Sequence, residues 1–383
     1  MLVAPTDSDG VYQAIQPAVA NFSILGVEKY SSIYRGMGVK NSTNAVSPLT
    51  NIITDSLTEA DVRRLFGMGS GGPYAVPSDV SLVQYSSAVF PGGDARLPGA
   101  IYAANLRVEA LRWATWLFRQ QASLSRDSVY RQIEVTFFQM QPSLSAYVAR
   151  KPAASLVTVG ELTDYLGGLR PTTRPVRDDV IQAAALLLSR YFDAAKQIDT
   201  NAAITPRYSL LQYSYVHDVL VELYLKNSAA AAADVSSITT AQLVTLADSY
   251  TDPQPLPTGT FLPATDVLHL APSGSATVYR YYPMLDPLLS WQPNMLGNDV
   301  DYGAGTYTIT NGTTPSFGDQ ADGTVTAVRV PAKFAGAITA TLQANQSAIV
   351  QAKPGFTGVA WFEYDATSTR GNNTTGRVYV TVF

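Results

Sequence analysis

Two aspartates in the segment NMLGNDVDYG could begin a metal site. Asp299 and Asp301 stand two positions apart, so in an extended strand their carboxylates would point to the same face. Calcium binds about six or more oxygen ligands, and the nearest further acids are Asp319 and Asp322. Two interpretations remain open, a calcium site or a turn in which Asn298 and Asp299 hydrogen-bond to their own backbone. The sequence favours the turn.

The two histidines are the next candidates for chemistry. His217 is followed at once by Asp218 and, five positions on, by Glu222. A histidine beside a carboxylate can serve as a general base. Neighbouring residues on a helix, however, diverge by about 100° and do not face each other. The spacing therefore favours a packed or surface histidine over a catalytic one, and His269 is predicted to lie in a strand.

The remaining signals for chemistry are weak. The glycine-rich run 67–72 lacks the Gly-Lys-Ser/Thr ending of a phosphate-binding loop, so it is interpreted as a helix end and a loop. The sequence has no Gly-x-Ser-x-Gly elbow in a strand-to-helix setting. Paired carboxylates for glycoside hydrolysis stay open, because the fold sets their spacing.

Tyrosines crowd one predicted helix. They could line a sugar groove, but core and interface packing is the simpler interpretation. The four residues are Tyr208, Tyr213, Tyr215 and Tyr224. We therefore predict a non-enzymatic protein with no catalytic, cofactor-binding or metal-binding residue.

Composition restricts the possible partners. The chain has 383 residues, of which 46% are hydrophobic and 15% charged, with a formal net charge of −4. This balance is typical of a globular protein and argues against nucleic acid as a main partner, which requires a basic surface. We expect no sequence-specific binding of nucleic acid. The absence of cysteine excludes disulfides, zinc–thiolate sites and thiol nucleophiles.

Targeting and membrane signals are not apparent in the sequence. The first residues, MLVAPTD, lack the basic start and apolar core of a signal peptide. No stretch approaches the run of about 20 apolar residues that a membrane helix needs. We therefore expect no export signal and no membrane partner.

The chain is predicted to divide into four parts. Residues 1–99 form an irregular segment with short elements, 100–250 a helical domain, 251–264 a proline-rich linker, and 265–383 a β-sandwich. The fold class is therefore multidomain α+β, mainly helical first and then antiparallel β.

Start and stop signals locate the helices. The first is capped by Ser56 or Thr58 and ends at Gly67, and Pro175 is placed near the first turn of a later one. Thr158 with Glu161, and Thr239 with Gln242, have the spacing of a capping box. Within the helical domain, the predicted helices cover 103–121, 158–169, 174–199, 208–227 and 239–250.

After the linker, the hydrophobic period changes from that of a helix to that of a strand. Short runs rich in threonine, valine and tyrosine alternate with glycine, asparagine and aspartate turns, which is typical of an antiparallel sandwich. In the last run, Val378, Val380 and Val382 share one face. The runs are GTYTITNG, GTVTAVRV, GAITATLQ, GVAWFEYDAT and GRVYVTVF.

Three segments of this C-terminal part, taken in order, resemble bacterial cadherin-like and immunoglobulin-like repeat domains. They are MLGNDVD (295–301), PGFTGVAWFEYDA (354–366) and GRVYVTV (376–382), and Phe356, Phe362 and Tyr364 match the core aromatics of the pattern. The resemblance covers about 265–383, with one copy instead of a tandem array and ATSTRGNN in place of a short turn. It implies a domain that presents or binds surfaces, and we recognise no family for residues 1–260.

Two functions of different classes fit these observations. The first is a structural protein of a virus particle, capsid or capsid-associated, located in the virion, and we expect that virus to be a phage. It would form a large homo-oligomer through its helical part, contact other virion proteins and present the sandwich, which could bind a glycan or host surface. The alternative is an extracellular or cell-surface protein that binds or cleaves carbohydrate, with the sandwich as a spacer.

Overall fold

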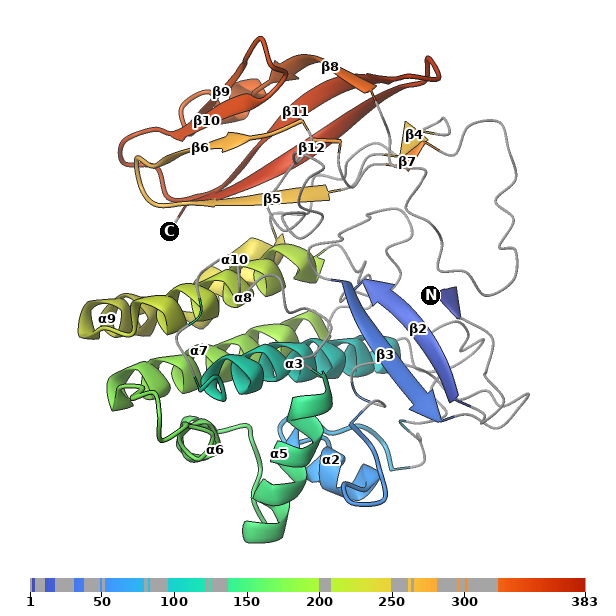
Figure 1. Cartoon of the computed structure of the whole chain (residues 1–383), viewed down its shortest axis with the longest axis vertical. Helices are drawn as coiled ribbons and strands as arrows, with labels where there is room; N and C mark the ends of the chain where they lie inside the picture. Colours follow the sequence, from blue (N-terminus) through green and yellow to red (C-terminus); the bar gives the residue numbers. More distant parts are fainter. Residues whose placement is uncertain are drawn as a thin grey trace. The chain divides into compact units, whose positions relative to one another are not determined.

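The protein, in a computed structural model, consists of two compact units. One contains the elements from β1 to α10, and the other those from β4 to β12 (Figure 1). None of the helices in the described part of the chain has the length and apolar composition that a membrane crossing would require. The structure describes residues 2–3, 11–17, 31–37, 49, 52–78, 82, 96–121, 124, 137–199, 208–248, 261–262, 265–280, 295–296, 300–301 and 323–382.

The first unit is mainly helical and also contains a three-stranded sheet, which the sequence did not predict. The sheet has the order β1-β2-β3, with β1 (Leu2–Val3), β2 (Val11–Pro17) and β3 (Ser31–Met37). The helices are α2 (Glu59–Leu65), α3 (Arg96–Phe118), α5 (Phe137–Arg150), α6 (Val159–Gly167), α7 (Asp178–Asp199), α8 (Tyr208–Lys226), α9 (Ala229–Ser237) and α10 (Thr240–Asp248).

Helix α3 is the centre of this unit. It packs against α5, α6, α7 and α8, and every residue from Leu106 to Phe118 is buried. A helix that is buried on all sides cannot show the single apolar stripe of a surface helix, which explains the mixed spacing of its apolar residues. Figure 1 shows α7 running beside it.

The predicted helix starts are confirmed where a local cap defines them. Thr58 caps α2 in a full capping box with Asp61, and Gly67 follows the helix with φ +64°. The box of Thr239 and Gln242 also forms before α10.

Two other features at helix starts differ from the sequence expectation. Thr158 caps α6, but the carboxylate of Glu161 binds the amide and hydroxyl of Ser155. Pro175 lies outside α7, which begins at Asp178.

Sequence reasoning also missed α5 and α9. Helix α5 contains Pro142, a residue that normally interrupts helices.

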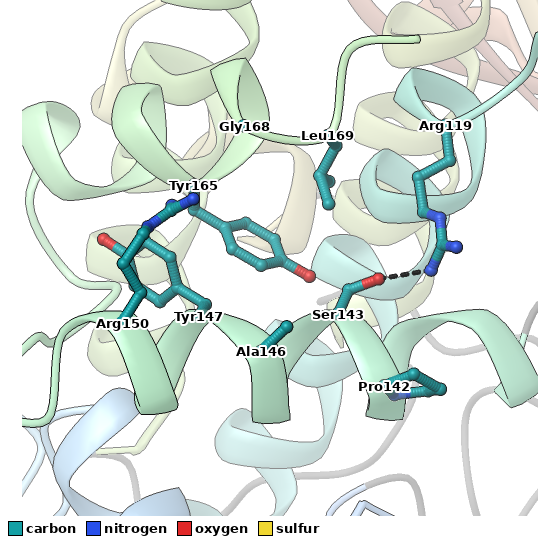
Figure 2. A pocket seen from close by; sticks show the side chains of 9 residues that line it. All are labelled: Arg119, Pro142, Ser143, Ala146, Tyr147, Arg150, Tyr165, Gly168 and Leu169. Atoms are coloured by element: carbon teal, nitrogen blue, oxygen red, sulfur yellow. Dashed lines mark hydrogen bonds between the residues drawn. The ribbon is translucent and has the colours of Figure 1, made fainter.

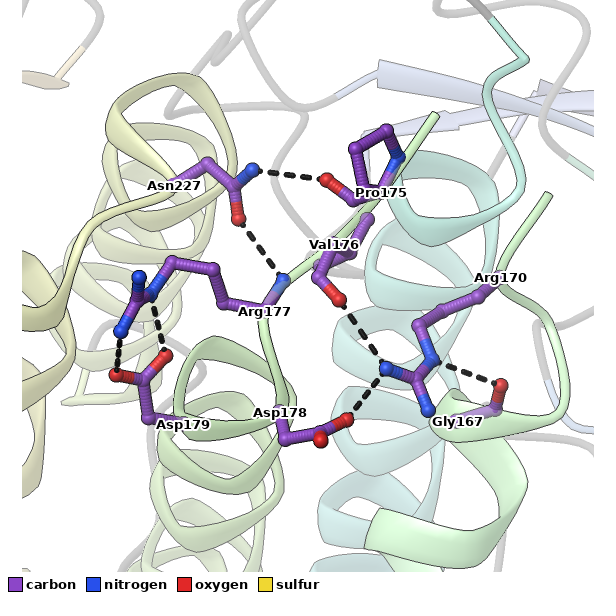
Figure 3. Close-up of polar contacts among 8 residues, drawn as sticks. All are labelled: Gly167, Arg170, Pro175, Val176, Arg177, Asp178, Asp179 and Asn227. Carbon is purple, nitrogen blue, oxygen red and sulfur yellow. Dashed lines mark hydrogen bonds and ion pairs between the residues drawn. The ribbon is translucent and has the colours of Figure 1, made fainter. Parts of the chain in front are cut away.

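Side chains at the ends of three helices fix the connection between α6 and α7 (Figure 3). The Nη1 atom of Arg170 donates to the Val176 carbonyl at 3.1 Å and to Asp178 Oδ1 at 2.5 Å. Asn227, just after α8, donates from Nδ2 to the Pro175 carbonyl and accepts from the Arg177 amide. These bonds satisfy backbone groups that a loop would otherwise leave to water, so the start of α7 is tied to the ends of both α6 and α8.

The second unit has two main sheets with the orders β6-β10-β9 and β5-β12-β11-β8. A short pair, β4 (Phe261–Leu262) with β7 (Val300–Asp301), is separate from them. The strands of the main sheets are β5 (Thr265–Leu270), β6 (Ser275–Val278), β8 (Gly323–Arg329), β9 (Ile338–Leu342), β10 (Ala348–Ala352), β11 (Gly358–Ser368) and β12 (Asn373–Val382), and η5 (Ala332–Phe334) is a 3₁₀ turn.

Both main sheets contribute to one core. Phe362 and Tyr364 of β11 face it with Val378 and Val380 of β12, and Val350 of β10 belongs to the same cluster. The α+β class and the shared valine face of β12 are thus confirmed. One expectation was wrong: the sheets are not purely antiparallel, because β5 pairs parallel to β12. The predicted strand within 305–312 and most of the predicted linker lie outside the described residues.

A glycine in β12 leaves room for a core aromatic. Tyr364 lies opposite Gly376 in the register of β11 and β12, and its side chain is 0% exposed. A Cβ atom at Gly376 would lie 2.0 Å from Cζ of Tyr364, far inside van der Waals contact. The tyrosine ring therefore occupies the space that a side chain at this position would need.

We predict that Gly376→Ala destabilises the sandwich by about 1–3 kcal/mol, the usual cost of overpacking a core. Gly336→Ala is the matched control, because a Cβ there would meet nothing within 4 Å, and it should stay within about 0.5 kcal/mol of the wild type. Urea unfolding followed by near-UV circular dichroism measures both. Equal stability of the two variants would contradict this account of the packing.

Candidate functional site

The structure describes only part of the acidic segment near residue 300. Asp301 pairs with Phe261 in the short β4–β7 ladder, in keeping with the predicted strand. Asn298, Asp299, Asp319 and Asp322 lie outside the described residues, so the calcium interpretation stays a prediction. Across the part of the chain that the structure describes, no group of three or more histidines or acids is arranged to hold a metal ion.

The histidine on α8 does meet its neighbour, contrary to the sequence argument. Nδ1 of His217 lies 3.0 Å from Oδ1 of Asp218, because the two side chains bend toward each other although their Cα–Cβ directions diverge. The imidazole is 2% exposed, and its edge meets the ring of Trp113 at 4.4 Å between centroids. A ring so enclosed cannot reach a substrate, so this pair serves packing.

The other singled-out side chains are also structural. Glu222 contacts Lys226 at 3.6 Å. His269 lies in β5, as predicted, and its Nδ1 atom contacts the hydroxyl of Thr381. Burial raises the pKa of Tyr215 to about 12, and Tyr224 is 1% exposed. The structure does not describe the side chains of Tyr208 and Tyr213.

A pocket between α3, α5 and α6 is the best candidate for a binding site (Figure 2). Its volume is about 320 Å³, near the lower end of the range for small-molecule sites. Helix α5 forms one wall, α6 supplies an aromatic ring and the turn after it, and the end of α3 adds an arginine. The lining residues are Arg119, Pro142, Ser143, Ala146, Tyr147, Arg150, Tyr165, Gly168 and Leu169.

Hydrogen bonds position the polar groups of this pocket. Nη1 of Arg119 donates to Oγ of Ser143 at 2.5 Å, which links the end of α3 to α5 across the cavity (Figure 2). The hydroxyl of Tyr165 lies 2.9 Å from that of Thr115 on α3. The Tyr147 and Tyr165 rings meet edge to face at 5.2 Å. Contacts to neighbouring helices therefore hold the arginine and both rings in place.

The second arginine of the pocket lies beside the end of α6. Nη2 of Arg150 is 3.9 Å from Oδ2 of Asp164, whereas Nζ of Lys151 is 2.8 Å from the same oxygen. The hydrogen bond from Lys151 is the main cause that lowers the pKa of Asp164. A Cβ at Gly168 would lie 3.2 Å from Nη2 of Arg150, so the glycine leaves space for the guanidinium.

The pocket offers hydrogen-bonding side chains and aromatic rings to a ligand. Burial raises the pKa of Tyr147 to about 12 and also raises that of Tyr165, so both phenols stay neutral at ordinary pH. Ser143 is bonded to Arg119, and a guanidinium cannot take up a proton. Arg119 therefore cannot act as the base that would activate this serine as a nucleophile.

Sequence reasoning missed this pocket. Arg119 was assigned to a predicted helix, but α5 was not predicted, and it supplies five of the nine lining residues, among them Tyr147 and Arg150. These two residues are three positions apart, so they share one face of a helix. This spacing indicates a shared site only after the helix itself has been recognised.

No protein-family model matches this chain, and no curated protein or solved structure shows significant similarity to it.

A charged pair lies within the core on α3, one of the helices that form the pocket. Nη2 of Arg112 is 2.5 Å from Oε2 of Glu109, and the two side chains are 1% and 0% exposed. The guanidinium also lies 5.3 Å from the ring centroid of Trp113. If one partner is removed, the charge that stays buried on the other destabilises the fold strongly.

We predict that Glu109→Gln lowers the free energy of unfolding of the helical unit by about 3–5 kcal/mol, because Arg112 keeps a buried charge without its counterion. The double change Glu109→Met with Arg112→Leu should recover part of that loss. The matched control is Asp178→Asn, which removes an ion pair whose carboxylate is 89% exposed; its cost should stay within about 1 kcal/mol. Urea unfolding monitored at 222 nm gives the values, and equal costs at both sites would refute the prediction.

Proposed function

We propose that this chain is a non-enzymatic structural protein of a virus particle, a capsid or capsid-associated component. In this proposal the helical unit makes the contacts between copies and the C-terminal unit is an immunoglobulin-like sandwich that meets other surfaces. The proposal rests on the strand order of the sandwich, on its exposed face, and on the composition of the chain.

Strand order supports the immunoglobulin-like assignment. Lettered A to G in chain order, the strands of the two main sheets have the orders B-E-D and A-G-F-C. Immunoglobulin constant-type domains have the sheets A-B-E-D and C-F-G. Among the described strands of these two sheets, the difference is the first strand, β5, which joins β12 instead of β6. The turn from β5 to β6 contains Ser273 with φ +59° and a bond from the Gly274 amide to the Ala271 carbonyl.

The observation that carries the proposal is an exposed, uncharged sheet face. On β6, β10 and β9 the residues that alternate with the core residues point away from it, and none of these described residues is charged. Ile349 lies at the centre, between Thr277 and Thr341, and is 43% exposed. The face comprises Ser275, Thr277, Thr339, Thr341, Ile349 and Gln351. A flat face with few charges suits contact with another surface, because little desolvation of charge opposes binding.

Assembly is the first property to test. We expect the purified chain to form particle-sized species that grow with concentration, seen by sedimentation velocity and by negative-stain electron microscopy. Repeated copies bury apolar and aromatic surface between them, and such burial drives association. A monomer that persists across the full concentration range would refute the proposal.

The variant Ile349→Asp separates the two assigned roles. It introduces a charge at the centre of the exposed face, where it should change the free energy of unfolding by no more than about 0.5 kcal/mol. We expect particles of wild-type size, because the helical unit makes the contacts between copies. Loss of particles from this well-folded variant would assign the contact to the sandwich and overturn that part of the proposal. Ile349→Thr, which extends the threonines of this face, is the matched control.

A further inference from the structure

We propose that the pocket between α3, α5 and α6 binds a small organic anion, in which a phosphate or carboxylate group is carried on an aromatic or apolar body. This site is independent of the proposed assembly role. It is inferred from the charges, the rings and the size of the cavity.

The charge of the lining is positive. Arg119 and Arg150 both line the cavity, and none of the described lining residues is acidic. Guanidinium groups are planar and bind carboxylates and phosphates through paired hydrogen bonds. Figure 2 shows the two arginines on different sides of the cavity, so an anion between them would interact with both.

One acid, Asp164, forms a long ion pair with Arg150 and a shorter one with Lys151. Asp164 is outside the lining and lies closer to Lys151, at 2.8 Å, than to Arg150, at 3.9 Å. The carboxylate is therefore already engaged by the ammonium of the lysine. The side chain of Arg150 is 56% exposed, so an anion that enters from solvent can reach it despite the long contact with Asp164.

The apolar and aromatic lining residues determine which kind of group can carry the phosphate or carboxylate of the ligand. The ring of Tyr165 extends toward Ser143, the ring of Tyr147 stands beside it, and Pro142, Ala146 and Leu169 complete the wall (Figure 2). Aromatic rings favour edge or offset contacts with another ring. A volume of about 320 Å³ accommodates a single substituted ring. The pocket therefore favours an aromatic anion over a bare inorganic one.

Calorimetric titration of the full-length protein at low ionic strength tests this inference with three probes. Phenyl phosphate should bind. Inorganic phosphate, which lacks the ring, should bind about tenfold more weakly, and benzyl alcohol, which lacks the charge, should show no binding at the same concentrations. Added salt should weaken the binding of phenyl phosphate, because ions screen a partly exposed charge pair. Absence of phenyl phosphate binding at millimolar concentration would overturn the proposal.

Two variants place the binding in this pocket. Arg150→Gln should raise the Kd for phenyl phosphate about tenfold, the loss expected for one charged hydrogen bond, whereas Lys226→Gln, at an exposed lysine outside the pocket, should leave it unchanged. Ala146→Leu should abolish binding by filling the cavity. Its matched control is Ala149→Leu, on the same helix but outside the lining.

All four variants change exposed side chains, so thermal unfolding should match that of the wild type and show that the fold is kept. An unchanged Kd in both Arg150→Gln and Ala146→Leu would refute the site. If the Kd is unchanged in both variants and these variants also form smaller assemblies in sedimentation, the pocket receives a side chain from a second copy. That outcome would also overturn the proposal.

Discussion

Charged side chains buried on one helix constrain how the helical unit can fold. Arg107, Glu109 and Arg112 of α3 are at most 1% exposed, and a buried charge costs several kcal/mol unless a partner meets it. The guanidinium of Arg107 lies 3.7 Å from the ring centroid of Tyr74, and Glu109 pairs with Arg112. A rotation of α3 about its axis would break the contact with Tyr74. Just past the end of the helix, the partly buried Arg119 donates to Ser143 on α5.

The sequence predicted those parts of the fold that depend on neighbouring residues. The cap of α2 at Thr58 and the box before α10 were found because each needs only a side chain and an amide three positions away. The valine face of β12 was found because it repeats with period two. Helix α5 was missed because Pro142 argues locally against a helix, and only packing on α3 and the rest of the unit outweighs that local preference. The parallel pairing of β5 with β12 joins segments about a hundred residues apart, and no local pattern carries that information.

The candidate site was less predictable than the fold for the same reason. Its arginines come from the end of α3 and from α5, and its rings from α5 and α6, so the cavity exists only after three helices have packed. The one constellation that looks catalytic in sequence, His217 with Asp218, does form, and at hydrogen-bond distance. It is enclosed against Trp113, and burial of that kind follows from tertiary packing, which residue spacing does not encode.

The two outer faces of the sandwich differ, and this difference indicates which one is available to a partner. On the four-stranded sheet, the outward residues Trp361, Arg377 and Tyr379 are 4%, 4% and 1% exposed. The Trp361 ring has Nζ of Lys333 at 4.1 Å from its centroid and the guanidinium of Arg377 at 4.5 Å, so its stacking surface is already in use. On the three-stranded sheet, Ile349 is 43% exposed within a row of threonines that carry no charge. Because a covered face cannot bind without first being uncovered, the proposed recognition of another surface would use the threonine face.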